Sequence, residues 1–474
     1  MTRTLTRATL RQAGGIDAAD RRILALAGPA LGALVVEPVY NLTDTAIVGH
    51  LGRASLGGLA VASAVLNLLV YGCGFLAMAT TPRVAFLRAS GDDAGAFRAA
   101  ATAYWLAAAL GLALAALVAG AAHPLAVLAG AHGADLPKAV TYLRVAAAGM
   151  PFVLVMLAGN GHLRGLADTR TPFAIVLVSN AVNVVVEIGL VYGAGWGVAG
   201  SALGTVGAQA LAAVAFVSVS RRRARARRVP LRPDRSEARR LVRSGAVLVV
   251  RTLALVAALN GSTVVAARLG VVRLGGHQIA LQIWLLVAMS LDALAVPAQI
   301  LIGETLGTHG ARGPGATEAA LRVSRRVLRW GVLVSAGLGA ATAALSPLLP
   351  AAFTSDPAVR HQAMIGLIFV GASLPLAAAA FELDGILLGA GDFAALRRAM
   401  IVALGGFLPL ALATAFHHSL GLAGVWGALT CWLATRTVVL ARRWRSRAWL
   451  GAGPGDPDVT NGSPLRVGVS GPDR

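Results

Sequence analysis

The chain of 474 residues is 57% hydrophobic and only 13% charged, whereas an ordinary soluble domain is about 25% charged. Its 42 Lys and Arg outnumber its 21 Asp and Glu, which gives a formal net charge of +21. Because the arginines gather in loops between long apolar runs, the composition excludes a soluble domain, argues against nucleic-acid binding and indicates a polytopic membrane protein.

The apolar runs predict an all-α membrane protein with twelve transmembrane helices. The first run is a full span behind a polar, Arg-bearing segment, so no cleavable signal peptide is expected. The expected spans are 23–50, 56–82, 98–122, 139–160, 172–193, 197–220, 240–268, 276–303, 323–346, 362–388, 397–416 and 420–441.

We expect the spans to form two lobes, an N-lobe at 23–220 and a C-lobe at 240–441, joined by a basic linker at 221–239. Residues 1–22 form a cytoplasmic N-terminal segment in this prediction. Residues 442–474 are expected to be a cytoplasmic, disordered tail, since their later part is rich in Gly, Pro and Asp.

Arginine placement predicts the topology. Residues 221–243 hold eleven Arg, and the loops after spans two, four, eight and ten are also Arg-bearing, whereas the loops at the other end are poor in Arg. The positive-inside rule then places both termini and the basic linker in the cytoplasm. The expected location is the cytoplasmic membrane, with the linker in contact with anionic lipid.

The two lobes are predicted to be internal repeats. Residues 51–62 match 269–280 at six of twelve positions, at an offset of 218. Two further sets of matches follow in order: Pro151, Leu163, Gly165 and Asp168 with Pro375, Leu387, Gly389 and Asp392 at an offset of 224, and Gly197, Val198 and Gly200 with Gly424, Val425 and Gly427 at 227. An even number of spans per repeat gives both lobes one orientation, which predicts a cleft between them.

Motifs for enzymes and cofactors are missing from the sequence. Lys138 is the only lysine and follows Leu136-Pro137, so no phosphate-binding G-x-x-x-x-G-K-[ST] loop exists, and no His-Glu-x-x-His or G-x-S-x-G motif occurs. We therefore expect a secondary transporter without a cofactor. Cys73 and Cys431 lie in apolar runs and are expected to be buried thiols without a disulfide or metal.

Span one carries the most informative residue, Asp44. A carboxylate at bilayer depth costs about 2.5–3.5 kcal/mol on insertion scales, so such residues usually serve ion or proton chemistry. Glu37, Tyr40 and Asp44 follow one another at spacings of three and four, which places them on one helix face. Pro29 and Pro38 can bend this helix, because proline lacks the backbone donor.

Two further spans repeat the pattern. Asn180, Asn183 and Glu187 share one face of span five, and Thr205 and Gln209 share one face of span six. Polar side chains within spans normally face the protein interior, so these stripes predict a shared polar pocket with span one.

The pocket is expected to bind a coupling cation. Carboxylates brought close together cannot both ionise cheaply, which favours a shared proton. Alternatively, Na⁺ could bind the oxygens of Asp44, Asn183, Glu187 and Thr205. A helix-packing network without a transport role is the remaining alternative.

The C-terminal half offers Arg251, Asp292, Glu382 and Asp384 as candidates for lining the substrate cleft. An Arg–acid pair that only stabilises the lobe explains them equally well. The repeat counterpart of Asp44 is Ser262, so the acidic first-helix site is expected in one lobe only.

The residues resemble the multidrug and toxic-compound extrusion (MATE) family, in particular its DinF-like branch, over about residues 20–442. The resemblance rests on four segments: Asp44-Thr-Ala-Ile-Val-Gly-His-Leu-Gly52, Arg164-Gly-Leu-Ala-Asp-Thr-Arg-Thr-Pro172, Asn183-x-x-x-Glu187 and Gly197-Val-Ala-Gly-Ser-Ala202.

The resemblance implies twelve helices in two lobes and drug extrusion driven by inward H⁺ or Na⁺. It makes Asp44 the first-helix proton or cation site, lined by Glu37 and Tyr40, and Pro29 the proline whose bending accompanies protonation. Asn183 and Thr205 fall on family pocket positions. Relatives carry Asp where this chain has Glu187. The longer side chain of Glu keeps the charge but shifts the carboxylate oxygens, which affects the geometry of Na⁺ binding more than the uptake of a proton.

The expected function is a cation-coupled antiporter, acting as a monomer in the bilayer, that exports small amphipathic and often cationic compounds. The alternatives are a lipid-linked saccharide flippase and an exporter of an endogenous metabolite on the same two-lobe plan. A polyanionic cargo would call for a cationic cleft, whereas the predicted pocket of the N-lobe is acidic. Arg251 is the one residue that favours the flippase.

Overall fold

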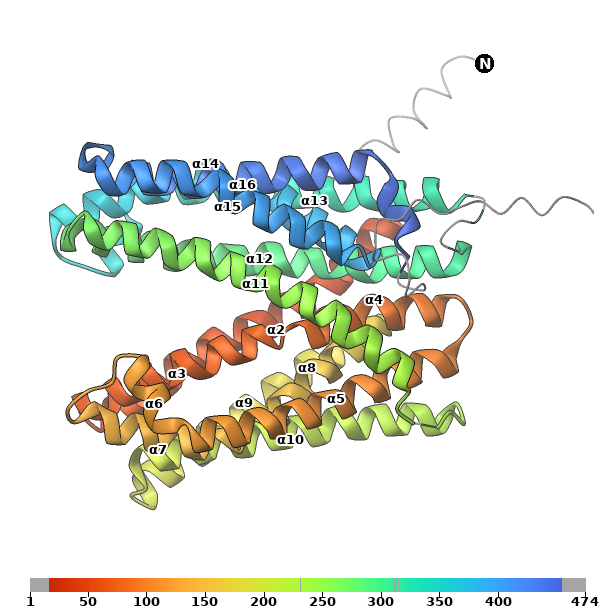
Figure 1. Ribbon diagram of the computed structural model, residues 1–474, viewed down its shortest axis with the longest axis horizontal. Coiled ribbons are helices and arrows are strands. Elements are labelled where there is room, and N and C mark those ends of the chain that lie inside the picture. Colours follow the sequence, from red (N-terminus) through yellow and green to blue (C-terminus); the bar gives the residue numbers. More distant parts are fainter. Residues whose placement is uncertain (1–16, 231, 311–312, 314, 454–474) are drawn as a thin grey trace, which may run out of the picture.

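The computed structural model describes residues 17–453 except 231, 311–312 and 314, and it leaves the side chain of Glu37 undescribed. Within this part of the chain every regular element is helical (Figure 1). The N-lobe contains α2 (Ala18–Gly49), α3 (Arg53–Gly72), α4 (Phe75–Ala89), α5 (Asp93–Gly120), α6 (Ala122–Leu128), α7 (Asp135–Ala147), α8 (Met150–Gly165), α9 (Arg170–Ile188), the π-helical turn η1 (Gly189–Gly193) and α10 (Gly197–Ala226).

The C-lobe follows the same plan with longer, less broken helices. It contains α11 (Arg235–Arg268), α12 (Val271–His309), α13 (Ala316–Ala344), η2 (Leu349–Ala352), α14 (Pro357–Gly389), α15 (Phe393–Phe416), η3 (His418–Leu420), α16 (Gly421–Arg445) and η4 (Ala448–Gly451). Eleven stretches of the described chain are long and apolar enough to cross a membrane, and the bent pair of α7 and α8 makes a twelfth. The prediction of twelve spans in two lobes is confirmed.

Two spans of the N-lobe are interrupted where the sequence supplies a reason. Gly72-Cys73-Gly74 separates α3 from α4, since glycine disfavours the middle of a helix. Pro151, at the start of α8, follows a bend of 53° between α7 and α8. In the C-lobe the corresponding spans, α12 and α14, are continuous. The two repeats therefore differ in the continuity of these two spans.

The duplication is visible in matching ion pairs. Asp168, before the fifth span of the N-lobe, pairs with Arg223 at the end of the sixth. Asp392, its repeat counterpart, stands before the fifth span of the C-lobe and pairs with Arg443 of the sixth at 2.6 Å. Each pair joins the same two helices of its own lobe.

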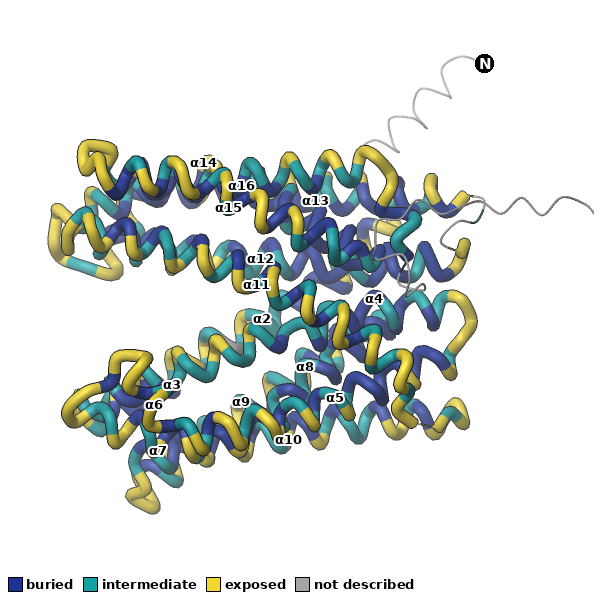
Figure 2. Tube along the Cα trace, viewed as in Figure 1, coloured by how far each residue is buried: buried dark blue, intermediate teal, exposed yellow. Residues whose placement is uncertain are grey.

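The lobes meet at one end of the molecule, here called the closed end, and diverge toward the other, the open end (Figure 1). The start of α2, the α10–α11 connection and the end of α16 lie at the closed end. Figure 2 shows buried residues concentrated where the lobes meet and exposed residues over the turns of the open end. The Arg-rich segments predicted to share one side of the membrane thus gather at the closed end.

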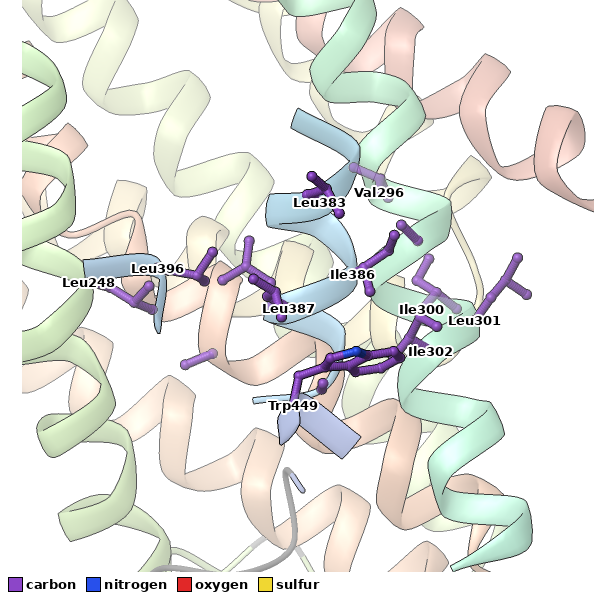
Figure 3. Close-up of a cluster of buried hydrophobic side chains, with 14 of the residues drawn as sticks. Leu248, Val296, Ile300, Leu301, Ile302, Leu383, Ile386, Leu387, Leu396 and Trp449 are labelled. Atoms are coloured by element: carbon purple, nitrogen blue, oxygen red, sulfur yellow. The ribbon is translucent and has the colours of Figure 1, made fainter. Parts of the chain in front are cut away.

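Close helix packing holds the closed end together. Gly303 and Gly307 of α12 face α4, where Cβ atoms added to them would lie 3.1 Å from Ala85 Cβ and 2.9 Å from Ala89 Cβ. This G-x-x-x-G spacing lets two helix backbones from different lobes approach closely. Next to it, α12 and α14 bury a cluster that includes Ile302, Ile386 and Trp449 (Figure 3).

Several boundary predictions are corrected. The expected linker 221–239 is mostly helical, because α10 runs to Ala226 and α11 begins at Arg235. The expected tail is ordered at its start: α16 continues to Arg445 and η4 buries Trp449 completely. The rest of that tail, 454–474, and all but six residues of the segment 1–22 lie outside the described residues. Cys73 is buried as expected, whereas the prediction of a buried Cys431 is wrong, because this residue of α16 is exposed.

Candidate functional site

A cavity of about 590 Å³ lies between the lobes. Both lobes contribute to its wall, and the residues come from spans that are far apart in the sequence. Nine of the predicted site residues line it: Tyr40, Asp44, Asn180, Asn183, Thr205, Gln209, Arg251, Asp292 and Asp384. The polar stripes therefore meet in one place, as expected for a cleft between two repeats.

Asp44 lies where α2 packs against α9 and α10. Its side chain is buried, and its Oδ1 accepts a hydrogen bond of 2.6 Å from the Ser201 hydroxyl of α10. One turn earlier on α2, the Tyr40 hydroxyl is 2.7 Å from the Thr205 hydroxyl, also on α10. These two bonds join the same helices one turn apart, so the protonation state of Asp44 bears directly on the α2–α10 contact.

Glu187 of α9 is the neighbour of Asp44 and is completely buried behind the cavity wall. Gly204 of α10 makes room for it, because a Cβ there would lie 3.2 Å from Glu187 Cβ and 3.0 Å from Asn183 Oδ1. Within the described residues, both carboxyl oxygens of Glu187 and the Oδ1 of Asn183 are buried without a hydrogen-bond partner. Buried acceptors of this kind call for a proton or a cation.

The donor set fits a monovalent cation better than a transition metal. Asp44, Glu187, Asn183 and Thr205 supply carboxylate, amide and hydroxyl oxygens, the ligands that hard cations prefer. No group of three or more His, Cys, Asp or Glu side chains in the described part of the chain could hold a metal ion. Chemically, the site can take up a proton on one carboxyl group or hold Na⁺ among its oxygens.

Two residues of this site were not predicted. Ser201 donates to Asp44 and lies one turn before Thr205, so extending the polar face of span six by one turn would have found it. Tyr142 of α7 is buried beside Asp44, Tyr40 and Thr205 and lines the cavity. A single aromatic residue in an apolar span carries no sequence signal for such a role.

The C-lobe wall is organised around Asp384 of α14. Arg251 of α11 and Arg436 of α16 both donate through Nη2 to its Oδ2. Arg436 was not predicted, although an arginine within an apolar span is itself a signal. It lies over the rings of Phe381 and Trp432, at 5.4 Å and 5.6 Å from their centroids.

Repeat-related positions face the same cavity. Gly74 and its counterpart Asp292 both line it, as do Asn160 and its counterpart Asp384. Ser262, the counterpart of Asp44, is buried inside the C-lobe and lies 3.3 Å from His277. The acidic site on the first helix of a lobe therefore has no acidic equivalent in the second.

Besides Glu187, three predicted residues lie away from the wall. Glu382 was expected at the cleft, but it is completely buried and packs against Gly331 of α13. Residues two positions apart on a helix point in nearly opposite directions, so Glu382 faces away from Asp384 and from the cavity. Pro29 and Pro38 lie within α2, which remains helical through both. The side chain of Glu37 lies outside the described residues.

Comparisons with known proteins agree with this architecture. The family model described as MatE matches residues 29–188 and 249–416. The chain is 33% identical over 444 residues to Protein DETOXIFICATION 44, chloroplastic, of Arabidopsis thaliana, with 91% of this chain and 83% of that protein covered. It is 29% identical over 454 residues to DNA damage-inducible protein F of Escherichia coli (strain K12), with 92% and 95% covered.

A solved structure described as the outward-facing conformation of a multidrug resistance MATE family transporter of the MOP superfamily superposes with a TM-score of 0.81. Its sequence identity is 21%, and the match covers 91% of this chain and 96% of that one. The chain is thus a multi-pass membrane protein and a secondary transporter, not an enzyme. It belongs to the MATE family of multidrug and toxic-compound efflux transporters, and within it to the DinF-like kind.

Proposed function

We propose that this protein is an antiporter that couples the inward movement of H⁺ or Na⁺ to the export of small amphipathic compounds bearing a cationic group. The observation that carries this proposal is the first-lobe site, where Asp44 lies beside the buried Glu187 on the wall of the cavity between the lobes. A negative wall of this kind attracts both a coupling cation and a cationic substrate, and so makes them compete.

Competition between the two cations is the basis of the exchange. When Asp44 and Glu187 carry no added cation, their charge favours a cationic substrate in the cavity. When a proton or Na⁺ binds there, the charge falls and the substrate is released. The Asp44–Ser201 and Tyr40–Thr205 contacts join α2 to α10, so loading the site also changes the contact between these helices.

The closed end is proposed to face the cytoplasm, because it gathers the Arg-rich connections. Both termini then lie on the cytoplasmic side of the cytoplasmic membrane, and the conformation is open to the outside. Each elementary charge that enters through a potential of 100 mV supplies about 2.3 kcal/mol, which supports severalfold accumulation per cation. A single chain supplies both lobes and the whole cavity, which supports action as a monomer.

The proposal is tested with ethidium, a cationic dye, in inverted membrane vesicles, where the cytoplasmic face is outermost. A pH gradient with an acidic lumen and an Na⁺ gradient with high luminal Na⁺ are imposed separately. Uptake driven by either gradient, and absent in vesicles without the protein, is the expected result. Uptake that follows neither gradient would overturn cation coupling.

A lipid-linked saccharide flippase is disfavoured by the same cavity. Its cargo carries phosphate groups, whereas Asp44 and Glu187 make the N-lobe wall acidic. Saturable binding of an undecaprenyl phosphate carrier to the purified protein, together with no gradient-driven ethidium uptake, would reverse this conclusion.

A further inference from the structure

The C-lobe wall of the cavity carries more positive than negative charge in its buried ion cluster. Arg251 and Arg436 share a single carboxylate oxygen of Asp384, so two positive charges meet one negative charge. All three side chains are at least nine-tenths buried, and Arg251 and Asp384 line the cavity. The cluster therefore has a formal excess of one positive charge.

The hydrogen bonding of the cluster is incomplete as well. Within the described residues, the Nε of Arg251 and the Nε of Arg436 are buried without an acceptor. A cluster that served only to hold the lobe together would be expected to balance its charge and satisfy its donors, because uncompensated buried charge is strongly destabilising. These Nε atoms are shielded from the cavity, but the guanidinium group of Arg251 lines it, and a guanidinium at a cavity wall is suited to an anionic ligand.

The charged residues around the cluster do not cancel its excess positive charge. Arg164 of α8 and Asp292 of α12 line the cavity close to each other and contribute one charge of each sign. Glu382, the nearest other acid on α14, packs against Gly331 instead of lining the cavity, and it makes no ion pair with any described residue. Asp292 also lies near Arg251 and Arg436, but with Arg164 counted the three arginines still outnumber the two aspartates at this wall by one, and an anion within the cavity would balance that charge.

The opposite wall has the opposite sign. Asp44 lines the cavity on the N-lobe side, with Glu187 directly behind it. One cavity of about 590 Å³ thus presents a carboxylate on one lobe and a guanidinium on the other. Cavities of this size hold drug-sized molecules.

We propose that the compounds which this cavity binds most tightly are dipolar, with a cationic group bound at Asp44 and a carboxylate, sulfonate or phosphate group bound at Arg251. This inference rests on the proposed function, since it assigns the substrate class of the same cavity. A purely cationic compound meets the positive C-lobe wall, and a purely anionic one meets the acidic N-lobe wall. A compound with both groups matches both walls.

The test compares two ligands that differ only in the anionic group: the unsubstituted rhodamine with a free carboxylate, and the methyl ester of the same dye. Their affinities for the purified protein in lipid nanodiscs are measured by fluorescence anisotropy. Wild type is expected to bind the free acid more tightly. Arg251→Gln should weaken binding of the acid about tenfold, as for one charge-assisted hydrogen bond, and change binding of the ester by less than about twofold.

Two further variants separate a ligand site from a structural one. Asp384→Asn releases both guanidinium groups, so binding of the acid should tighten or stay unchanged while binding of the ester weakens; a structural role predicts equal losses for both dyes. This variant carries the test by itself if Arg251→Gln does not fold. Arg223→Gln removes an arginine from the Asp168 pair, outside the cavity, and should change neither affinity.

The outcomes distinguish the inference from the proposed function. If wild type binds the ester as tightly as the acid, or if Arg251→Gln weakens both dyes equally, the dipolar substrate class is overturned while export of cations still stands. If wild type binds neither dye and drives no ethidium uptake, both are overturned.

Discussion

The contact between α4 and α12 is expected to control which side of the membrane the cavity faces. In Gly307→Ala the added Cβ would lie 2.9 Å from Ala89 Cβ and 3.0 Å from the carbonyl carbon of Phe86. The Phe86 carbonyl belongs to a helix backbone, so it cannot move aside as a flexible side chain would. Overpacking of this kind costs about 1–3 kcal/mol. This cost arises only in the conformation in which α4 and α12 are packed together at the closed end. The population of that state should therefore fall about 5–150-fold relative to the alternative.

Spin labels at Leu128 and Val271 measure this shift. Both residues are 85% exposed and lie at the open end, one in each lobe, so labels there should leave the packing unchanged. Double electron–electron resonance should show a shorter distance becoming populated in Gly307→Ala, as the open end closes. Gly337→Ala is the matched control, because nothing lies within 4 Å of its Cβ and the gain in helix propensity is the same. An unchanged distance distribution in folded Gly307→Ala would refute the role of this contact.

Three further predictions address the site and the closed end. Gly204→Ala places a Cβ 3.2 Å from Glu187 Cα and should reduce gradient-driven ethidium uptake more than it reduces binding, as measured in the vesicle and nanodisc assays. Trp449→Ala should destabilise the protein by about 3–5 kcal/mol, seen as a lower melting temperature in detergent; an unchanged value would mean that η4 does not dock. Burial by itself would raise the pKa of Asp168, but the hydrogen bonds from Thr171 and Arg223, together with the charge of Arg223, outweigh it and lower the pKa below its ordinary value. The stability that this ionised carboxylate contributes is present above its unfolded pKa of about 4 and is lost as pH falls through the lowered folded value. The melting temperature of wild type should therefore fall more steeply below about pH 4 than that of Asp168→Asn, and parallel curves would contradict the assignment.

The helical spacing of polar residues was sufficient to predict most of the N-lobe site. Tyr40 and Asp44, Asn180 and Asn183, and Thr205 all reach one cavity, because an intramembrane polar side chain must face the protein interior. The repeat, read from three collinear matches, fixed the relation of the lobes.

The sequence could not supply features that depend on how helices pack. The two arginines that share Asp384 come from α11 and α16, and nothing along either helix indicates that they converge. Glu382 and Asp384 differ only by their rotation on α14, which depends on the neighbouring helices. Trp449 follows a run of arginines typical of a cytoplasmic tail, and its burial in the same hydrophobic cluster as Ile302 and Ile386 (Figure 3) has no signal in the sequence.

The central claim is that cation coupling resides at Asp44 and in the first lobe alone. It is tested most directly by ethidium uptake into inverted vesicles, with matched protein levels, for Asp44→Asn and for Ser262→Ala at the repeat counterpart in the second lobe. Asp44→Asn should abolish the uptake driven by the imposed cation gradient, and Ser262→Ala should retain it. Full gradient-driven uptake in Asp44→Asn would contradict the claim.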